Sequence, residues 1–184
     1  MGGWSLGGAI AFEMAWQLTR MGGDVAFLAL FDSQAPLEED GRNGLSDLEL
    51  LGHLARSFRV PLDPDVLKPL SPEQQVATVL DVARRLNLVP PDLGQGRLQQ
   101  LLNVHKSVLH AVMNYRPDPY TGKVHLFKAS QIGSRRSTAP DMGWSRYTSV
   151  PVEIKTVPGN HFTMLNPPNV RVLGDELSVS LSRE

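Results

Sequence analysis

A serine near the start of the chain lies in a sequence that can make its hydroxyl group a nucleophile. Residues 3–7, GWSLG, fit the G-x-S-x-G pattern of a nucleophile elbow, in which a strained turn between a strand and a helix presents the serine, here Ser5. The hydroxyl then needs a neighbouring base to accept its proton. The pattern is weak by itself, and a helix N-cap at Ser5 is the alternative interpretation. Glycines at positions 3, 7 and 8 favour the elbow because they leave room for a tight turn.

An acid and a base for such a nucleophile stand later in the chain. Asp32 follows the apolar run VAFLALF, and a carboxylate at the carboxyl end of a parallel strand faces the crevice where α/β folds bind ligands. Capping of the next turn is the alternative role for Asp32. His161 lies in VPGNHFTML, just after the last expected strand, whereas the other four histidines lie inside expected helices or a strand. The order serine, aspartate, histidine is that of an α/β-hydrolase triad, in which the histidine deprotonates the serine and the aspartate orients and stabilises the imidazolium.

The sequence around these residues predicts the elements that would position them. Residues 7–21 carry apolar side chains at spacings of three and four, which predicts a helix that ends at the glycine pair 22–23. Residues 25–31 form a continuous apolar run, typical of a strand that is buried on both faces of a parallel sheet. The strand that must precede Ser5 is expected to lie before residue 1.

Residues 45–115 have helical patterns and no strand signal. Three helices are predicted, the first capped by Ser46 or Asp47, the second capped by Ser71, and the third beginning near residues 96–97. The region therefore reads as an all-helical insertion between two strands.

Strand patterns return after this insertion. Residues 122–130 alternate between apolar and polar, and residues 151–157 form a second strand pattern. A turn of helix is expected at Trp144 between them, and a closing helix is expected at residues 169–182 after a proline pair.

Composition narrows the possible functions. The 184 residues include 41% hydrophobic residues, enough for the core of one domain. A net charge of −1 argues against a nucleic-acid partner, and no apolar run approaches the roughly 20 residues that span a membrane. The absence of cysteine excludes disulfides and cysteine-based zinc sites, and it fits a cytoplasmic location.

The motifs together resemble one family. GWSLGGAIAFEMAWQL, VAFLALFDS, GKVHLFKA, MGW and VPGNHFTML are similar, in this order, to the thioesterase domains that end modular nonribosomal peptide and polyketide synthetases, and to their free-standing editing relatives. The resemblance covers nearly the whole chain. It implies an α/β-hydrolase fold with a mostly parallel sheet, of which this chain holds the C-terminal portion, and a helical lid inserted at about residues 45–115.

For the site, the resemblance implies that Ser5 is the nucleophile, that Asp32 and His161 are its acid and base, and that the backbone N–H of Leu6 is one oxyanion donor. The substrate would be an acyl or peptidyl thioester on the phosphopantetheine of a carrier protein, released by water or by cyclisation. No metal and no bound cofactor are implied. A carboxylesterase or lipase with the same triad, and a non-catalytic hydrolase that only binds a carrier protein or lipid, are the alternatives.

The resemblance also leads us to expect an N-terminally truncated domain in residues 1–184. The family has strands before the elbow, and these supply the elbow strand and the second oxyanion donor. Without them the strand at residues 25–31 would lose one partner. We therefore expect residues 1–184 alone to hydrolyse an acyl-N-acetylcysteamine thioester only weakly. Robust turnover that disappears in Ser5→Ala would contradict this expectation.

Overall fold

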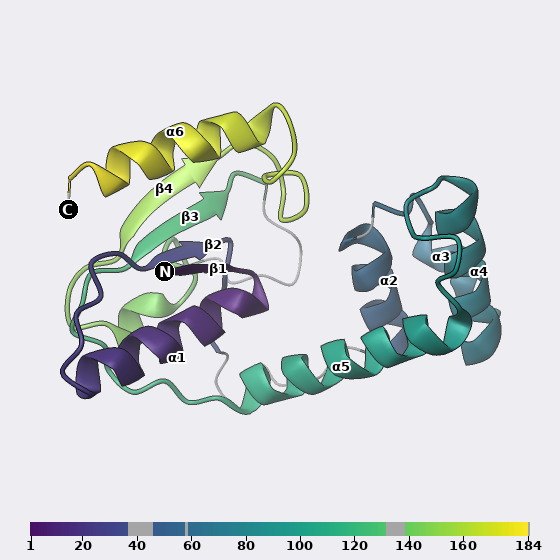
Figure 1. Ribbon diagram of the computed structural model, residues 1–184, viewed down its shortest axis with the longest axis horizontal. Coiled ribbons are helices and arrows are strands. Elements are labelled where there is room, and N and C mark those ends of the chain that lie inside the picture. The colour runs from purple at the N-terminus through teal and green to yellow at the C-terminus, as the bar shows by residue number, and fades with distance from the viewer. Residues whose placement is uncertain (37–45, 58, 132–138, 184) are drawn as a thin grey trace. The chain divides into compact units, whose positions relative to one another are not determined.

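Figure 1 shows the computed structural model of the chain, which describes residues 1–36, 46–57, 59–131 and 139–183. The chain divides into two units, Met1–Glu38 with Val112–Glu184, and Glu39–Ala111. The first unit contains the sheet, and the second is helical.

The sheet has four strands, and each neighbouring pair is parallel. The strands stand side by side in chain order: β1 (Gly2–Trp4), β2 (Ala29–Phe31), β3 (His125–Ala129) and β4 (Glu153–Val157). Helix α1 (Leu6–Arg20) lies along one face of the sheet and α6 (Asn169–Leu181) along the other, as Figure 1 shows. The predicted α/β class with a parallel sheet is therefore confirmed.

The two central strands, β2 and β3, are buried on both faces of the sheet. Alternate residues of β2 and β3 point to opposite sides, so that Leu30 and Leu126 pack against α1, whereas Ala29 and Phe127 pack against the side of α6. The strand predicted within residues 122–130 is confirmed as β3, and side chains on both of its faces are buried, as a central parallel strand requires.

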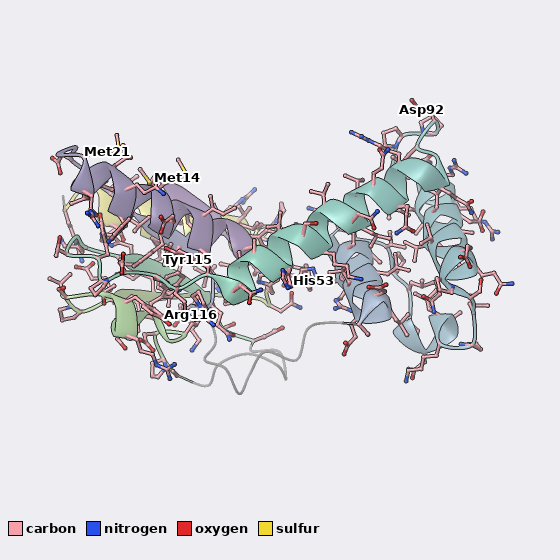
Figure 2. The ribbon with its side chains drawn as sticks, turned by 90° about the horizontal axis from the view of Figure 1, so that it is seen from below. Met14, Met21, His53, Asp92, Tyr115 and Arg116 are labelled. Atoms are coloured by element: carbon pink, nitrogen blue, oxygen red, sulfur yellow. The ribbon has the colours of Figure 1, made fainter. Side chains whose placement is uncertain are left out.

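Helix α1 packs on the sheet through alanines and a phenylalanine. Ala11, Phe12 and Ala15 are buried, whereas Met14 is 51% exposed and Ile10 is 49% exposed. Figure 2 shows Met14 pointing outward from the helix. The helical spacing of the apolar residues is as predicted, but Ile10, Met14 and Leu18 lie on the solvent side of the helix, and the face with Ala11, Phe12 and Ala15 meets the sheet.

Just after the helical unit, a tyrosine of the chain contacts α1. The Tyr115 hydroxyl donates a hydrogen bond to Oε2 of Glu13 on α1, and Figure 2 places Tyr115 beside that helix. Burial raises the pKa of Tyr115, and the hydrogen bond to Glu13 raises it further. The hydroxyl therefore stays protonated and keeps its role as a donor.

The strand before Ser5 lies within the chain, contrary to the expectation that it precedes residue 1. Residues Gly2–Trp4 form β1, which pairs with β2 in the register Gly3 to Leu30 and Trp4 to Phe31. Strand β2 therefore has a partner on each side, and the expected loss of one partner is wrong. The pattern missed β1 because three residues are too few to show periodicity.

The second unit has four helices among the described residues, α2 (Asp47–Ser57), α3 (Pro64–Leu67), α4 (Pro72–Arg85) and α5 (Gln95–Asn114), the last of which ends in the first unit. Ser46 caps α2, because its Oγ accepts from the Glu49 N–H and the Glu49 carboxylate accepts from the Ser46 N–H. Ser71 caps α4 in the same way, as predicted. The helix at Pro64–Leu67 was not predicted, although Asp63 caps it and a proline begins it.

Most of the remaining elements agree with the predictions, and one strand is shorter. A 3₁₀-helix, η2 (Trp144–Tyr147), provides the expected helical turn, and α6 begins directly after the proline pair. The predicted strand at residues 25–31 is shorter than expected, with only its last three residues paired in β2. No helix in the described ranges is long and apolar enough to cross a membrane.

A pair of glycine substitutions tests how tightly α1 meets the sheet. A Cβ on Gly8 would lie 2.2 Å from Oγ of Ser33, whereas one on Gly7 would meet nothing within 4 Å. We predict that Gly8→Ala lowers the free energy of unfolding by about 1–3 kcal/mol, as overpacking does. Gly7→Ala should leave it unchanged or raise it by up to about 1 kcal/mol, because alanine favours the helix. Urea denaturation measures both, and equal stabilities would mean that Ser33 yields to the added methyl group.

Candidate active site

Ser5 occupies the sharp turn between β1 and α1. Its backbone has φ 57° and ψ −126°, a conformation that costs a residue other than glycine about 1–3 kcal/mol. The Ser5 N–H donates to the Phe31 carbonyl at 3.0 Å, which holds the turn against the end of β2. The Ser5 side chain makes no capping hydrogen bond to the helix. Ser5 thus stands at the N-cap position of α1 without a capping side-chain bond, in a strained strand-to-helix turn of the kind that the motif predicts.

The first glycine of the motif makes this turn possible. A Cβ on Gly3 would lie 1.9 Å from the carbonyl oxygen of Gly7, so that only glycine fits there. A side chain at Gly3 or Gly8 would therefore clash with the turn, as predicted, whereas a Cβ at Gly7 would clash with nothing.

Leu6 is the first residue of α1. By helix geometry, the N–H groups of the first turn have no carbonyl one turn earlier to bind within the helix. Such a backbone donor, next to the serine, could face an oxygen that gains negative charge during a reaction.

Asp32 follows the last residue of β2 and is 2% exposed. Its N–H donates to the Phe127 carbonyl at 2.8 Å, and its Oδ1 accepts from the Ala129 N–H at 2.9 Å. Its φ of 44° is a second strained backbone angle beside the elbow. These bonds tie the carboxylate to the carboxyl end of β3, and they leave Oδ2 for a different partner.

That partner is His161, which is 8% exposed. Nδ1 of His161 lies 2.8 Å from Oδ2 of Asp32, although the two residues are 129 positions apart in the sequence. An ionised carboxylate can only accept, so with Asp32 ionised Nδ1 is the donor of this bond and Nε2 is the basic nitrogen of the ring. The structure thus brings together the predicted acid and base at the carboxyl end of the sheet.

A tight loop after β4 presents the histidine. Oδ1 of Asn160 accepts from the N–H groups of Phe162 and Thr163, both at 3.0 Å. Gly159 has φ 95°, and its carbonyl accepts from the Gln131 N–H at 2.9 Å. The sequence reasoning did not assign Asn160 a role, although asparagine in a loop is a recognised turn-forming residue.

Trp4 is a further neighbour of the histidine that the sequence reasoning missed. Its indole stacks on the His161 imidazole with the ring centroids 4.6 Å apart and the planes 20° apart. Its Nε1–H donates to the His161 carbonyl at 3.1 Å. An aromatic residue at the variable position just before the serine was the only available signal.

Helix η2 supports the segment beside Asp32. Trp144 is fully buried, and its Nε1–H donates to the Ser33 carbonyl at 2.8 Å. Burial opposes ionisation of Asp141, but hydrogen bonds from Ser145 and Gly143 outweigh it and hold the pKa of Asp141 below its ordinary value. The ionised carboxylate thereby fixes the turn that carries Trp144.

The other histidines have structural surroundings. His125 is buried and stacks on Phe27 at 4.3 Å. Within the helical unit, His53 and His105 stack on each other at 5.4 Å, and burial lowers the pKa of His105. Over the described ranges, no group of three or more histidine, aspartate or glutamate side chains could hold a metal ion.

Several known proteins are similar to this chain in sequence and in fold. The thioesterase domain family matches residues 1–175. Chondramide synthase cmdD of Chondromyces crocatus is 28% identical over 199 residues, which cover 100% of this chain and 5% of that protein. The crystal structure of holo-AB3403, a four-domain nonribosomal peptide synthetase bound to AMP and glycine, matches with a TM-score of 0.83 and 26% identity. The matched region covers 97% of this chain and 14% of the synthetase chain.

A single thioesterase domain of known structure gives a similar result. The Vlm2 thioesterase domain matches with a TM-score of 0.61 and 26% identity, over 96% of this chain and 66% of that one. The chain thus spans a small part of the synthetases that it resembles, and about two thirds of this isolated domain. With a family match over residues 1–175, the chain belongs to the thioesterase domain family.

Proposed function

We propose that this chain releases an acyl or peptidyl group from the phosphopantetheine thioester of a carrier protein, with Ser5 as nucleophile, His161 as base and Asp32 as acid. The observation that carries the proposal is the buried hydrogen bond of 2.8 Å between Asp32 and His161, at the same end of the sheet as the strained Ser5. Family membership supports thioester chemistry at this site.

In the proposed reaction, His161 Nε2 takes the proton of the Ser5 hydroxyl while Oγ attacks the thioester carbonyl carbon. The carbonyl oxygen becomes negative, and the Leu6 N–H stabilises it by roughly 3 kcal/mol. The carbon–sulfur bond then breaks, His161 gives its proton to the departing thiol, and Ser5 holds the acyl group as an ester. Asp32 keeps the imidazole in place and stabilises its charged form throughout.

The second half of the reaction frees the acyl group. Water, or a hydroxyl or amine of the bound acyl or peptidyl group, attacks the Ser5 ester while His161 accepts the proton of this nucleophile. His161 then returns that proton to Ser5. Water gives a free acid, and an internal nucleophile gives a ring. The helical insertion at about residues 45–115 is proposed as the lid that decides between them by admitting or excluding water.

The relatives support a carrier protein as the partner. Chondramide synthase cmdD and holo-AB3403 are multidomain synthetases, and the chain matches 5% and 14% of their lengths. We infer that this chain acts on acyl groups presented by a neighbouring carrier domain, with no metal or cofactor of its own.

Substitution of the three proposed residues tests this function. In the protein as the cell makes it, we predict that Ser5→Ala, His161→Ala and Asp32→Asn each lower kcat for an acyl-N-acetylcysteamine thioester by about 10⁴-fold or more. Ser5→Ala should leave the melting temperature nearly unchanged, whereas His161→Ala and Asp32→Asn should lower it, because each disrupts the buried pair. A fluorophosphonate probe should label Ser5 in the unmodified protein, and mass spectrometry locates the label.

Ser130 provides the matched control. It follows β3 at the same edge of the sheet, is exposed, and makes a weak hydrogen bond of 3.4 Å to the Gly159 carbonyl. Ser130→Ala should keep most of the activity and all of the labelling. Labelling elsewhere than Ser5, or full activity in Ser5→Ala, would rule out the proposed nucleophile. Faster hydrolysis of a matched oxygen ester than of the thioester would instead favour a carboxylesterase.

A further inference from the structure

One side chain contacts both the ring and the backbone of His161. The Trp4 indole stacks on the imidazole with centroids 4.6 Å apart, and the Trp4 Nε1–H donates to the His161 carbonyl at 3.1 Å. These contacts join residues that are 157 positions apart in the sequence. Trp4 therefore restrains His161 at two separate points.

The hydrogen bond to Asp32 cannot orient the imidazole alone. It fixes Nδ1 at one point, 2.8 Å from Oδ2, and leaves the ring free to tilt about that point. The Trp4 stack limits this tilt, and the Phe162 ring packs against the imidazole in an edge-to-face arrangement, with centroids 5.0 Å apart. With Asp32 and Trp4 together, the direction in which Nε2 points is determined.

The position of Trp4 in the chain links this restraint to the serine. Trp4 is the last residue of β1 and lies opposite Phe31 in the sheet register. Ser5 and Asp32 are the first residues after the ends of these two strands, and successive Cα atoms are about 3.8 Å apart. A tilt of the indole therefore moves the imidazole relative to the serine that follows it.

We propose that Trp4 is a positioning residue for the reaction, which fixes the plane of the His161 imidazole and stabilises its charged form through the indole face. This inference rests on the proposed function, in which His161 is the base. An indole is the aromatic ring that attracts a cation most strongly, and the imidazole becomes a cation each time it takes the proton of Ser5. The effect of the stack is thus largest in the transition state, where it raises kcat rather than substrate binding.

Two substitutions separate the two contacts of Trp4. Trp4→Phe keeps a ring that can stack and removes the N–H donor, whereas Trp4→Leu removes both and keeps apolar volume. In the full-length protein we expect kcat for an acyl-N-acetylcysteamine thioester to fall about 10-fold in Trp4→Phe and about 100-fold in Trp4→Leu, with KM within about twofold. Trp16→Phe and Trp16→Leu are the matched controls, because Trp16 lies on α1 and stacks under Arg20. Both should keep kcat.

The rate of fluorophosphonate labelling as a function of pH separates the charge effect of the indole from loss of packing by the direction of the shift, because loss of packing alone would expose the imidazole to water and raise its pKa. The acid limb of this profile reports protonation of the base. It should shift toward lower pH in Trp4→Leu, because the imidazolium loses the indole face, and less in Trp4→Phe. The Asp32 carboxylate, on another edge of the ring, is unchanged in both variants.

The outcomes distinguish this inference from the proposed function. If Ser5→Ala and His161→Ala lose labelling but Trp4→Phe and Trp4→Leu keep the kcat and pH profile of the unmodified protein, Trp4 has no positioning role. A rise in KM with unchanged kcat would also overturn it. If Ser5→Ala or His161→Ala keeps its activity, the proposed function itself fails. If Trp4→Leu does not fold, the kcat of Trp4→Phe is compared with that of Trp16→Phe, and equal values would show that Trp4 has no positioning role.

Discussion

The buried carboxylate of Asp32 sets the constraint on which the site depends. A carboxylate at 2% exposure is costly unless its oxygens are bound, and removal of one partner from a buried ion pair typically costs about 3–5 kcal/mol. Oδ1 accepts a hydrogen bond from the Ala129 N–H at 2.9 Å, and Oδ2 lies 2.8 Å from Nδ1 of His161. The ends of β2 and β3 and the loop after β4 must therefore stand in one particular arrangement before this charge can be buried.

The surroundings of the site hold a strained backbone in place. Both Ser5 and Asp32 have positive φ values of 57° and 44°, and each follows the end of a strand. Two backbone hydrogen bonds support these turns, from Ser5 to the Phe31 carbonyl and from Asp32 to the Phe127 carbonyl. Such strain persists only where the neighbouring structure over-determines it, and a parallel sheet whose central strands are buried on both faces provides that support.

Much of this arrangement was predictable from sequence, because strand ends carry the chemistry in α/β folds. The parallel sheet, the closing helix and the placement of Asp32 and His161 after strands all followed from apolar runs and their ends. The roles of these residues with Ser5 as nucleophile stay predictions. The pattern could not say which face of α1 meets the sheet, since the exposed Ile10 and Met14 have the same helical spacing as the buried Ala11 and Ala15. Strand β1 was too short to detect.

Contacts between distant residues were out of reach for a different reason. The stack of Trp4 on His161 joins the first strand to the loop after the last one, and nothing local in the sequence signals it. The Ser33 carbonyl that receives the Trp144 N–H is a similar case, because the partners are 111 positions apart. Such contacts are a product of the whole fold, and they decide how side chains at correctly predicted positions are oriented.

The place of the helical unit in the chain has a consequence for folding kinetics. Its helices α2, α3 and α4, with most of α5, lie in the connection between β2 and β3, so pairing of these strands must close a long stretch of chain. Helices form from local contacts in about a microsecond, whereas distant strand pairing is slow. The entropy of closure rises only as the logarithm of loop length. We therefore expect local contacts to order the helical unit early and the hydrogen bond between residues 129 positions apart to form late.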